Sequence, residues 1–444
     1  MTVSTLGHIS PADVHGVLAR HMLADGYDFV VDFERSHGAW LHDARGGRDI
    51  LDFCMFFASN PLGYNHPKLQ DPEYLEVLHR VAALKPSLPD FYSVEFAGFV
   101  DVFARLALPE HMRYAFFVEG GALGVENALK TAFDWKVRKN QAKGIPGEKG
   151  RQVIHFRQAF HGRSGYTLSL TNTDPRKTDY FPKFSWPRIE NPGLRFPITP
   201  EVERDTAAAE ARALDAIEKA FAENPDDVAA IIVEPIQAEG GDVHFRPGFL
   251  RALERSAREH DAFFVLDEVQ TGVGITGKMW AHEHWGLRPD AVAFGKKLQV
   301  GGCMVGPRVD EAPDNVFKVS SRINSTWGGN LTDMVRGARM LEIVHEDGLL
   351  DNARSMGERL LAGLQALERE TGGVARNARG LGLMLAFDLA SGELRDRALE
   401  RTLANGLLLL PCGPLSIRFR PPLDLCAADL DAALDLVRKS LKEL

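Results

Sequence analysis

Two acidic residues and two lysines, each at the end of an apolar run, could carry out amine chemistry. Asp267 and Glu268 close the run AFFVLDE, and Lys296 and Lys297 follow the run DAVAFG. A lysine in a pocket has its pKa lowered by desolvation and neighbouring charge, so it can form a Schiff base and then carry a proton. A buried aspartate beside a pyridine nitrogen keeps that nitrogen protonated and makes the ring an electron sink. These residues suggest a pyridine-aldehyde cofactor, and two solvated surface lysines are the ordinary alternative.

A glycine pair further upstream could bind an anion. The segment VEGGALGVENALK places Gly120 and Gly121 between a predicted strand and a predicted helix. Backbone N–H groups at a helix N-terminus bind phosphate, and the helix dipole favours negative charge there. The segment lacks the GxxxxGK[ST] pattern, so a nucleoside triphosphate is not indicated. We expect a phosphate site at this turn, with a simple tight turn as the alternative.

Two further patterns are not expected to bind ligands. Gly272 to Gly277 fits GxGxxG, but the strand before it ends in two carboxylates, which would repel a pyrophosphate. The run His282-Glu283-His284 does not place two imidazoles on one helical face as HExxH does. We therefore expect neither a dinucleotide nor a metal ion.

Alternating strands and helices must hold these residues in place. Short β-rich runs are each followed by a longer helical pattern, which is typical of a parallel sheet with helices on both faces. The runs are YAFFVEGG, QVIHF, VAAIIVEP, AFFVLDE and DAVAFG. Active-site groups of such a sheet lie at the carboxyl ends of its strands. The prediction is an α/β fold with a large, mostly parallel sheet flanked by helices.

The chain changes character after about Gly337. Long helical stretches lead to GLGLMLAFDL, GLLLLPCG and LSIRFRPPL, and an amphipathic helix is predicted from about Ala427. We predict an N-terminal segment, 1–65, that contributes to a small α+β domain, a large cofactor-binding domain, 66–336, and a C-terminal small domain, 337–444. The most loop-like interior stretch is NPGLRFPITP at 191–200.

The composition is that expected of a soluble enzyme. With 444 residues and 45% hydrophobic content, the chain can bury a large core. Its 52 basic and 61 acidic residues leave a net charge of −9, which argues against nucleic acid as a partner. We find no run as long as a membrane span or a signal-peptide core, and the four cysteines are far apart. We expect a cytoplasmic protein with reduced thiols that does not contact the membrane.

Three ordered sites together resemble the class III aminotransferases of fold type I. They are the segment DEVQTGVG, the lysine six residues after the dipeptide PD, and the turn GGALGVENA. The resemblance covers nearly the whole chain. Within the class it is strongest to the lysine 6-transaminases, and one segment, GKMWAHEHWGL, is also similar to 4-aminobutyrate aminotransferases. The segments similar to lysine 6-transaminases are AFHGRSGYTLSLTNT, PKFSWPRI, IQAEGGDVHFRP, SRINSTWGGNLTDM and IRFRPPL.

The resemblance implies pyridoxal 5′-phosphate (PLP) as the cofactor. Lys296 takes the position of the lysine that bonds to it, as its intervals from Asp267 and Asp290 indicate. Lys297 is the rival, because the glycine pair begins four residues after it, as it does in relatives with one lysine. By the same resemblance Asp267 binds the pyridine nitrogen, Gln270 approaches the ring hydroxyl, and Phe160 stacks on the ring face.

The resemblance also implies a phosphate site that two subunits share. Gly121 and Ala122 match the phosphate turn, although this chain has Gly-Gly-Ala where many members of the class have Ser-Gly-Thr. Thr326 is expected to replace the missing hydroxyl. In the family, the segment of Asn324, Ser325 and Thr326 reaches the active site of the neighbouring subunit, so we expect a homodimer with Ser325 and Thr326 at the cofactor and Asn324 at the substrate.

Two arginines and one glutamate are implied to recognise substrates, because a guanidinium group binds a carboxylate through two hydrogen bonds. Arg163 matches the clamp for the carboxylate of the amine donor, and Arg418 matches the residue that holds the α-carboxylate of 2-oxoglutarate and L-glutamate. Arg420 is expected to point to the other face of its strand. Glu239 is expected to pair with Arg418 while lysine reacts and to leave it when 2-oxoglutarate binds.

The implied reaction transfers the ε-amino group of L-lysine to 2-oxoglutarate. The products are 2-aminoadipate 6-semialdehyde, which cyclises to 1-piperideine-6-carboxylate, and L-glutamate. Three alternatives remain: a 4-aminobutyrate or ornithine aminotransferase, an aminomutase that moves an amine within one molecule, and a regulator that senses PLP without turnover. The regulator would need an added DNA-binding domain, for which the sequence before Leu51 has no room.

Overall fold

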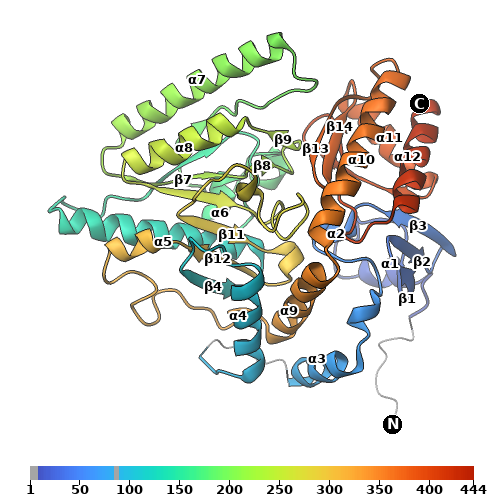
Figure 1. Ribbon diagram of the computed structural model, residues 1–444, viewed down its shortest axis with the longest axis horizontal. Coiled ribbons are helices and arrows are strands. Elements are labelled where there is room, and N and C mark those ends of the chain that lie inside the picture. Colours follow the sequence, from blue (N-terminus) through green and yellow to red (C-terminus); the bar gives the residue numbers. More distant parts are fainter. Residues whose placement is uncertain (1–8, 85–89) are drawn as a thin grey trace.

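The computed structural model describes residues 9–84 and 90–444, and its centre is a seven-stranded sheet (Figure 1). The strand order is β4, β12, β11, β10, β7, β5, β6, and all neighbours are parallel except β12, which is antiparallel to both β4 and β11. The bounds are β4 (Tyr114–Val118), β5 (Gln152–Phe156), β6 (Arg188–Ile189), β7 (Val228–Val233), β10 (Phe263–Asp267), β11 (Ala291–Phe294) and β12 (Gly301–Val305). The predicted mostly parallel sheet is confirmed, and the antiparallel strand β12 was not predicted.

Helices cover both faces of this sheet. Helix α5 (Gly121–Ala142) lies on one face, and α7 (Pro200–Glu223) and α8 (Pro247–Glu259) lie on the other (Figure 1). Every residue of β7, β10, β11 and β12 is therefore buried, as expected for a sheet covered on both sides. Helix α5 can approach β12 closely because Gly124 has no side chain: a Cβ atom there would lie 2.5 Å from the carbonyl oxygen of Gly302.

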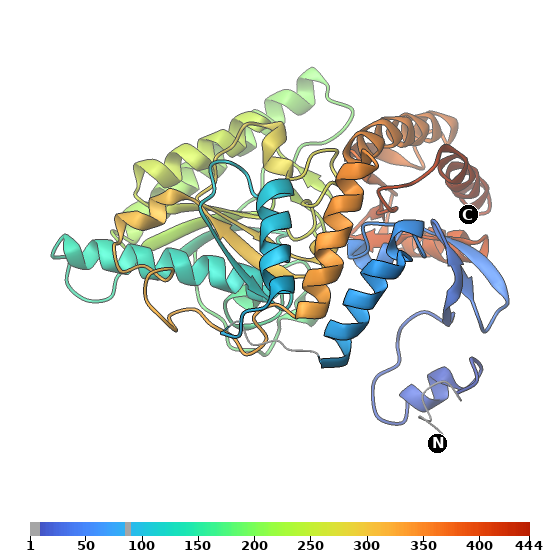
Figure 2. The ribbon, with the colours of Figure 1, turned by 60° about the horizontal axis from the view of Figure 1, so that its bottom comes forward.

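A second, smaller α+β part follows, as predicted. Its antiparallel sheet has the order β13, β14, β17, β16. The helices that accompany this sheet are drawn in orange to red in Figure 2. The strands are β13 (Arg376–Leu381), β14 (Met384–Asp388), β16 (Leu410–Cys412) and β17 (Ser416–Phe419), and the helices are α10 (Leu349–Glu370), α11 (Gly392–Ala404) and α12 (Ala427–Lys442). Strand β17 carries Arg418, paired with Ala386 of β14.

The N-terminal segment pairs with the C-terminal part of the chain. Strands β1 (Val31–His37), β2 (Trp40–Asp43) and β3 (Arg48–Asp52) form a sheet completed by β15 (Leu407–Leu408), in which Leu51 pairs with Leu407. Helix α9 (Leu331–Glu346) runs through position 337 and packs against α4 (Val94–Leu106) and α3 (Pro72–Leu84). The division at 65 and 336 stays a prediction, and residues 1–8 and 85–89 lie outside the described residues.

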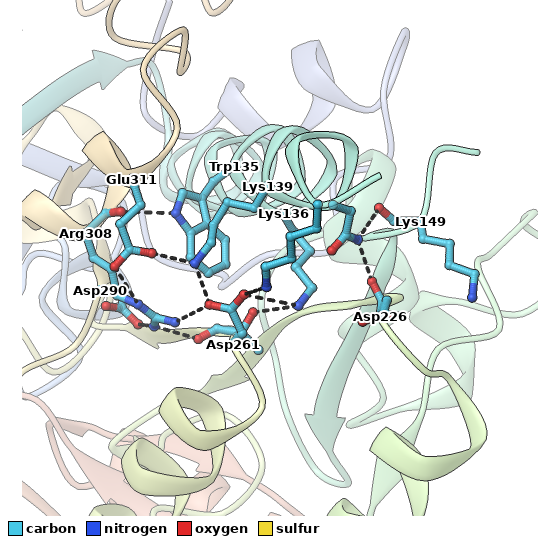
Figure 3. Close-up of polar contacts among 12 residues, drawn as sticks. Trp135, Lys136, Lys139, Lys149, Asp226, Asp261, Asp290, Arg308 and Glu311 are labelled. Atoms are coloured by element: carbon cyan, nitrogen blue, oxygen red, sulfur yellow. Dashed lines mark hydrogen bonds and ion pairs between the residues drawn. The ribbon is translucent and has the colours of Figure 1, made fainter. Parts of the chain in front are cut away.

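An ion network joins α5 to the amino-terminal edge of the large sheet (Figure 3). Asp290 directly precedes β11, and Asp261 lies two residues before the start of β10. The Asp261 carboxylate lies 2.6 Å from Lys139 Nζ, 2.8 Å from Lys143 Nζ and 3.3 Å from Arg308 Nη2. Arg308 Nη1 also lies 3.0 Å from Asp290 Oδ2. The network is at the edge opposite to the carboxyl ends of these strands, so it fixes the fold away from the site described next.

None of the described helices is long and apolar enough to cross a membrane. The described residues also contain no cluster of three or more His, Cys, Asp or Glu side chains that could hold a metal ion.

Candidate active site

Lys296 follows β11 at the carboxyl end of the sheet. Its backbone has a positive φ of 48°, directly after Gly295. Its Nζ atom donates a hydrogen bond to the Phe57 carbonyl oxygen over 3.2 Å. Burial, and next the positive charge of Arg418, lower the pKa of Lys296 to about 8, although Asp267 acts in the opposite direction. The neutral, nucleophilic form of the amine is therefore far more populated near neutral pH than it is in an ordinary lysine, whose pKa is about 10.4.

Lys297 has a different environment. Its side chain is buried, and its Nζ atom donates to the Gln270 carbonyl oxygen over 2.7 Å. Burial and the charge of Lys296 lower its pKa well below the ordinary value. The two rival lysines thus have separate partners, and Lys296 is the one whose amine faces the loop of Phe57.

A left-handed turn supplies the carbonyl group that Lys296 contacts. All four residues of α2 (Met55–Ala58) have positive φ angles, between 42° and 61°. Non-glycine residues rarely adopt this conformation, and a run of four is strained. Asp52 supports the turn, because its Oδ1 atom accepts from the N–H groups of Cys54 at 2.7 Å and Met55 at 2.9 Å. Such strain is found at sites where function requires a particular backbone direction.

Asp267 ends β10 and is held by a histidine. Its Oδ2 atom lies 2.7 Å from His161 Nδ1, and its Oδ1 atom accepts from Val269 N at 3.0 Å. Both side chains are buried. His161 was not among the predicted site residues, although it stands between Phe160 and Arg163 in the run FHGR. A histidine next to two predicted site residues was the available signal.

Glu268, the next residue, points the other way because alternate residues of a strand face opposite sides. Its carboxylate accepts from His282 Nδ1 at 2.7 Å and from the N–H groups of Ala281 and His282 at 2.6 and 3.0 Å. These hydrogen bonds hold its pKa below the ordinary value despite full burial. Glu268 therefore holds the following loop together, and of the two carboxylates only Asp267 lies on the side of Lys296.

The N-terminus of α5 meets both strand ends. A Cβ atom on Gly295 would lie 2.9 Å from the Cα atom of Gly121, and a Cβ atom on Gly121 would lie 2.5 Å from Val269 Cγ1. A Cβ atom on Gly162, whose φ is 128°, would lie 2.6 Å from Ala122 Cβ. The predicted phosphate turn, the loop after Asp267 and the loop before Lys296 are therefore in direct contact. The unpaired N–H groups of the helix end favour an anion at this point.

Gln270 links two arginines of the small domain to the same site. Its Oε1 atom accepts from Arg418 Nη1 at 3.3 Å and from Arg420 Nε at 2.9 Å. Arg420 is fully buried and binds the Asp242 carboxylate through two hydrogen bonds, at 2.9 and 2.5 Å. The expectation that Arg420 points to the other face of its strand is wrong, because residues two positions apart in a strand share a face. Asp242 neutralises Arg420, so Arg418 is the arginine that can receive a substrate.

Glu239 and Phe160 lie near a cation that was not predicted. Glu239 Oε1 forms an ion pair with Lys177 Nζ, and the same ammonium lies 5.5 Å from the centroid of the Phe160 ring. The Phe160 N–H donates to Glu234 Oε1 at 2.9 Å. The structure thus pairs Glu239 with Lys177, and Arg418 with Gln270. The pairing of Glu239 with Arg418 during reaction with lysine stays a prediction.

The other predicted substrate and phosphate residues lie at the surface. Arg163 is exposed just before α6 (Gly165–Leu170), and Asn324 and Thr326 are exposed in the loop before α9. Ser325 N contacts Asn324 Oδ1 at 2.7 Å. The carbonyl oxygen of Trp327 accepts from the N–H of Glu119 at 3.2 Å, so this loop is attached next to the phosphate turn.

The residues that are brought together fit PLP. They provide an amine with a lowered pKa, a buried carboxylate, a helix N-terminus for phosphate and a half-buried aromatic ring. Two further polar atoms, His161 Nε2 and Arg418 Nε, are buried and have no hydrogen-bond partner within the described part of the chain. Buried polar atoms without partners are costly, so both have capacity for a ligand.

Comparisons with known proteins match nearly the full length of the chain. The aminotransferase class-III family model matches residues 22–441. The L-lysine-epsilon aminotransferase of Mycobacterium tuberculosis is 51% identical over 97% of this chain and 96% of its own, and that of Streptomyces clavuligerus is 49% identical over 99% and 96%. The human mitochondrial 4-aminobutyrate aminotransferase is 34% identical over 90% and 82%.

Among solved structures, a lysine aminotransferase from M. tuberculosis superimposes with a TM-score of 0.96. It is 50% identical and covers 98% of this chain and all of its own. An ornithine aminotransferase from Toxoplasma gondii, 23% identical with a TM-score of 0.79, shares the fold.

Proposed function

The chain belongs to the class III aminotransferases, and from this premise we propose that it transfers the ε-amino group of L-lysine to 2-oxoglutarate. The products are 2-aminoadipate 6-semialdehyde, which cyclises to 1-piperideine-6-carboxylate, and L-glutamate. Sequence identity supports lysine as the donor most directly. Over nearly the full chain, the percentage of residues shared with L-lysine-epsilon aminotransferases is higher than the percentage shared with 4-aminobutyrate aminotransferases.

PLP is the cofactor of this enzyme class, and the site residues fit it as described above. When bound, PLP supplies an electron sink for the electron pair released at the substrate carbon. The N-terminus of α5, at Gly121 and Ala122, binds its phosphate, and Phe160 packs on its ring. Gln270 approaches the ring hydroxyl. Asp267 accepts a hydrogen bond from the protonated ring nitrogen and so keeps the proton on that nitrogen.

Lys296 has two tasks that follow from its position. Its neutral amine bonds to the cofactor, because burial and Arg418 keep its pKa near 8. The Lys296 amine would also carry the proton that leaves the substrate carbon, because it lies at the strand end where the cofactor would be held. Its hydrogen bond to the Phe57 carbonyl oxygen holds the amine at this place.

His161 orients the carboxylate that serves the ring nitrogen. Its bond to Asp267 uses one carboxylate oxygen and leaves lone pairs of the carboxylate for the ligand. Burial of the pair excludes water, so the interaction of Asp267 with a pyridinium proton is stronger than in solvent.

The substrate residues are assigned by charge and position. Arg163 binds the α-carboxylate of lysine, which leaves the ε-amine several bonds away, within reach of the cofactor carbon. Asn324 contacts the substrate. Arg418 binds the α-carboxylate of 2-oxoglutarate or glutamate, and Glu239 masks Arg418 while lysine reacts, because the reacting end of lysine carries no carboxylate.

We also propose a homodimer in the cytoplasm. Ser325 and Thr326 lie in a loop with exposed residues, and Thr326 can donate its hydroxyl to the phosphate site of a partner subunit. The four cysteines form no disulfide in the part of the chain that the structure describes, which agrees with a reducing compartment.

One assay tests the function. The PLP-loaded protein is given lysine, ornithine or 4-aminobutyrate, each with and without 2-oxoglutarate, and the products are identified by mass spectrometry. We expect lysine to be the best donor and glutamate to form only with 2-oxoglutarate. A higher rate with 4-aminobutyrate or ornithine would mean that this compound, and not lysine, is the amine donor. An isomer of lysine formed without the keto acid would indicate an aminomutase.

A further inference from the structure

Lys177 and Glu239 form an ion pair between two loops beside the candidate active site. Lys177 ends η2 (Pro175–Lys177), and Glu239 follows β8 (Ile236–Gln237). Their side chains are 17% and 24% exposed. The pair is therefore partly withdrawn from water, and it contributes more than a fully solvated pair.

Glu239 and Arg418 each keep capacity for another partner. Glu239 Oε2 and Arg418 Nε are buried and have no hydrogen-bond partner among the residues that the structure places. The loop of Glu239 is attached to the sheet of Arg418: the Glu239 carbonyl oxygen accepts from Gly413 N at 2.8 Å, and Gly413 follows β16, in which Leu410 pairs with Arg418. The backbone at Glu239 is thus attached to the end of the strand that pairs with the strand of Arg418, while the Glu239 side chain is paired with Lys177.

We propose that Lys177 is a positioning residue that competes with Arg418 for the carboxylate of Glu239. The proposal rests on the proposed function and adds a third residue to the choice between the two substrates. While Lys177 holds Glu239, Arg418 is available to the α-carboxylate of 2-oxoglutarate or glutamate. When Arg418 takes Glu239 instead, the site suits the uncharged reacting end of lysine. Lys177 therefore sets the equilibrium between the two arrangements.

The surroundings of Lys177 allow it to lose Glu239 at modest cost. Its Nζ atom lies 3.3 Å from Thr173 Oγ1 and 5.5 Å from the centroid of the Phe160 ring. A hydroxyl acceptor and an aromatic face both stabilise an ammonium group. The ammonium can stay in place when the carboxylate moves, so the pair can form again in each catalytic cycle.

The proposal is tested by binding of glutarate, a dicarboxylate without a keto group, to the PLP-loaded enzyme. Lys177→Met removes the competitor, so Glu239 shifts to Arg418 and we expect the dissociation constant of glutarate to rise about fivefold. The single-turnover rate with lysine should stay the same or increase. Arg176→Met is the matched control, because Arg176 is the neighbouring cation, is exposed, and pairs with Asp174; we expect no change in glutarate binding.

A second background separates positioning from simple charge. In Glu239→Gln there is no carboxylate for the two cations to share, so adding Lys177→Met should leave glutarate binding unchanged. An equal loss in both backgrounds would mean that Lys177 attracts dicarboxylates directly, and it would overturn the proposal. An unchanged dissociation constant in the single variant would overturn it as well. Cofactor absorbance and thermal unfolding verify that each variant is folded and loaded.

Failure of this inference differs from failure of the proposed function. If the unaltered enzyme does not use lysine, the donor assignment is wrong, whereas glutarate binding still reports whether Lys177 acts on Arg418 through Glu239. If lysine is used, but Lys177→Met weakens glutarate binding equally with and without the Glu239 carboxylate, only the role proposed for Lys177 is wrong.

Discussion

His161 Nδ1 lies 2.7 Å from Asp267 Oδ2, with both side chains buried at the carboxyl end of β10. The two residues are 106 positions apart in the chain. The contact links His161, which follows Phe160, to Asp267 at the end of β10. It means that the orientation of Asp267 depends on a second side chain, in addition to its place on the strand.

Asp267→Asn should lower kcat by about 100-fold or more, because a neutral partner does not hold a pyridinium proton. Cofactor affinity should change far less, since the phosphate and ring contacts remain. Steady-state kinetics and a cofactor titration measure the two effects. Glu268→Gln is the adjacent control, expected to alter stability more than kcat, and activity equal to that of the unaltered enzyme in Asp267→Asn would remove Asp267 from the mechanism.

Lys296 should react with an amine reagent over an unusual pH range. Its pKa is lowered to about 8 by burial and by Arg418, and only the neutral amine is nucleophilic. In the cofactor-free protein, labelling of Lys296 should therefore rise as the pH increases through about 8, well below the ordinary lysine pKa of about 10.4. Peptide mapping measures the labelling of Lys296 at each pH, and the labelling of the exposed Lys219 is the internal reference.

The loaded enzyme gives a second measurement on the same lysine. Borohydride should fix the cofactor to Lys296, and Lys296→Ala should abolish turnover because the bond to the cofactor and the proton carrier are both lost. Label found on Lys297 alone would contradict the assignment, as would normal turnover in Lys296→Ala.

Arg163→Ala and Arg418→Ala should affect different substrates. Without Arg163 we expect a higher KM for lysine and little change for 2-oxoglutarate. Without Arg418 we expect the KM for 2-oxoglutarate to rise about 100-fold, because a charged two-bond contact is lost. Each half-reaction is followed separately at the cofactor absorbance. If both variants change both substrates equally, the division of roles between the two arginines is incorrect.

Chains with different defects should complement each other if the active site is shared. Lys296→Ala removes the amine from its own subunit, and Thr326→Ala should weaken cofactor binding about tenfold in the neighbouring one. In a mixed dimer one of the two sites has both an intact lysine and an intact threonine. The two chains are co-expressed with different tags, and the mixed dimer is purified by using both tags in turn. This dimer should therefore have one site with native cofactor affinity. Mixed dimers without any native site would mean that Thr326 serves its own subunit.

Asp261→Asn should destabilise the fold by about 1 kcal/mol at pH 7. The residue lies among three cations at 2.6, 2.8 and 3.3 Å, and they would be left with less negative charge (Figure 3). Urea unfolding of the cofactor-free protein measures the change. Asp431→Asn is the control: its pair with Arg359 is 53% and 45% exposed, and we expect a smaller loss.

The same residue should make stability depend on acid pH. Its hydrogen bonds to Lys139 and Lys143 hold the pKa of Asp261 well below the ordinary value. A carboxylate with a lowered pKa in the folded state stabilises the protein above its unfolded pKa, about 4, and this contribution is lost as the pH falls below that value. The difference between Asp261→Asn and the unaltered protein should therefore shrink between pH 5 and pH 2. A constant difference would mean that the network is not electrostatic.

Much of the architecture follows from local sequence. The runs VAAIIV, FFVLD and AVAF form β7, β10 and β11, because short, nearly uninterrupted apolar runs are typical of strands buried on both faces of a sheet. Gly120 precedes α5, as the phosphate-turn pattern predicts, and its φ of 88° suits glycine. By contrast, the run GGCMV was not predicted to form β12, since two glycines weaken strand propensity. Only the packed fold requires them, because a Cβ atom on Gly301 would collide with the backbone of Gly120 and one on Gly302 with the carbonyl oxygen of Phe116.

Types and spacings of residues were thus sufficient to determine the fold class, the family, and the meeting of the α5 turn, Asp267 and Lys296 at one edge of a sheet, because strand ends and helix ends are local features. Only the tertiary structure decided which partners these groups have. It paired Asp267 with His161, Glu239 with Lys177, and Lys297 with the carbonyl oxygen of Gln270, and it brought Arg420 to the same side as Arg418. A side-chain partner depends on how distant loops pack against each other, and that information is distributed over the whole core instead of over neighbouring residues.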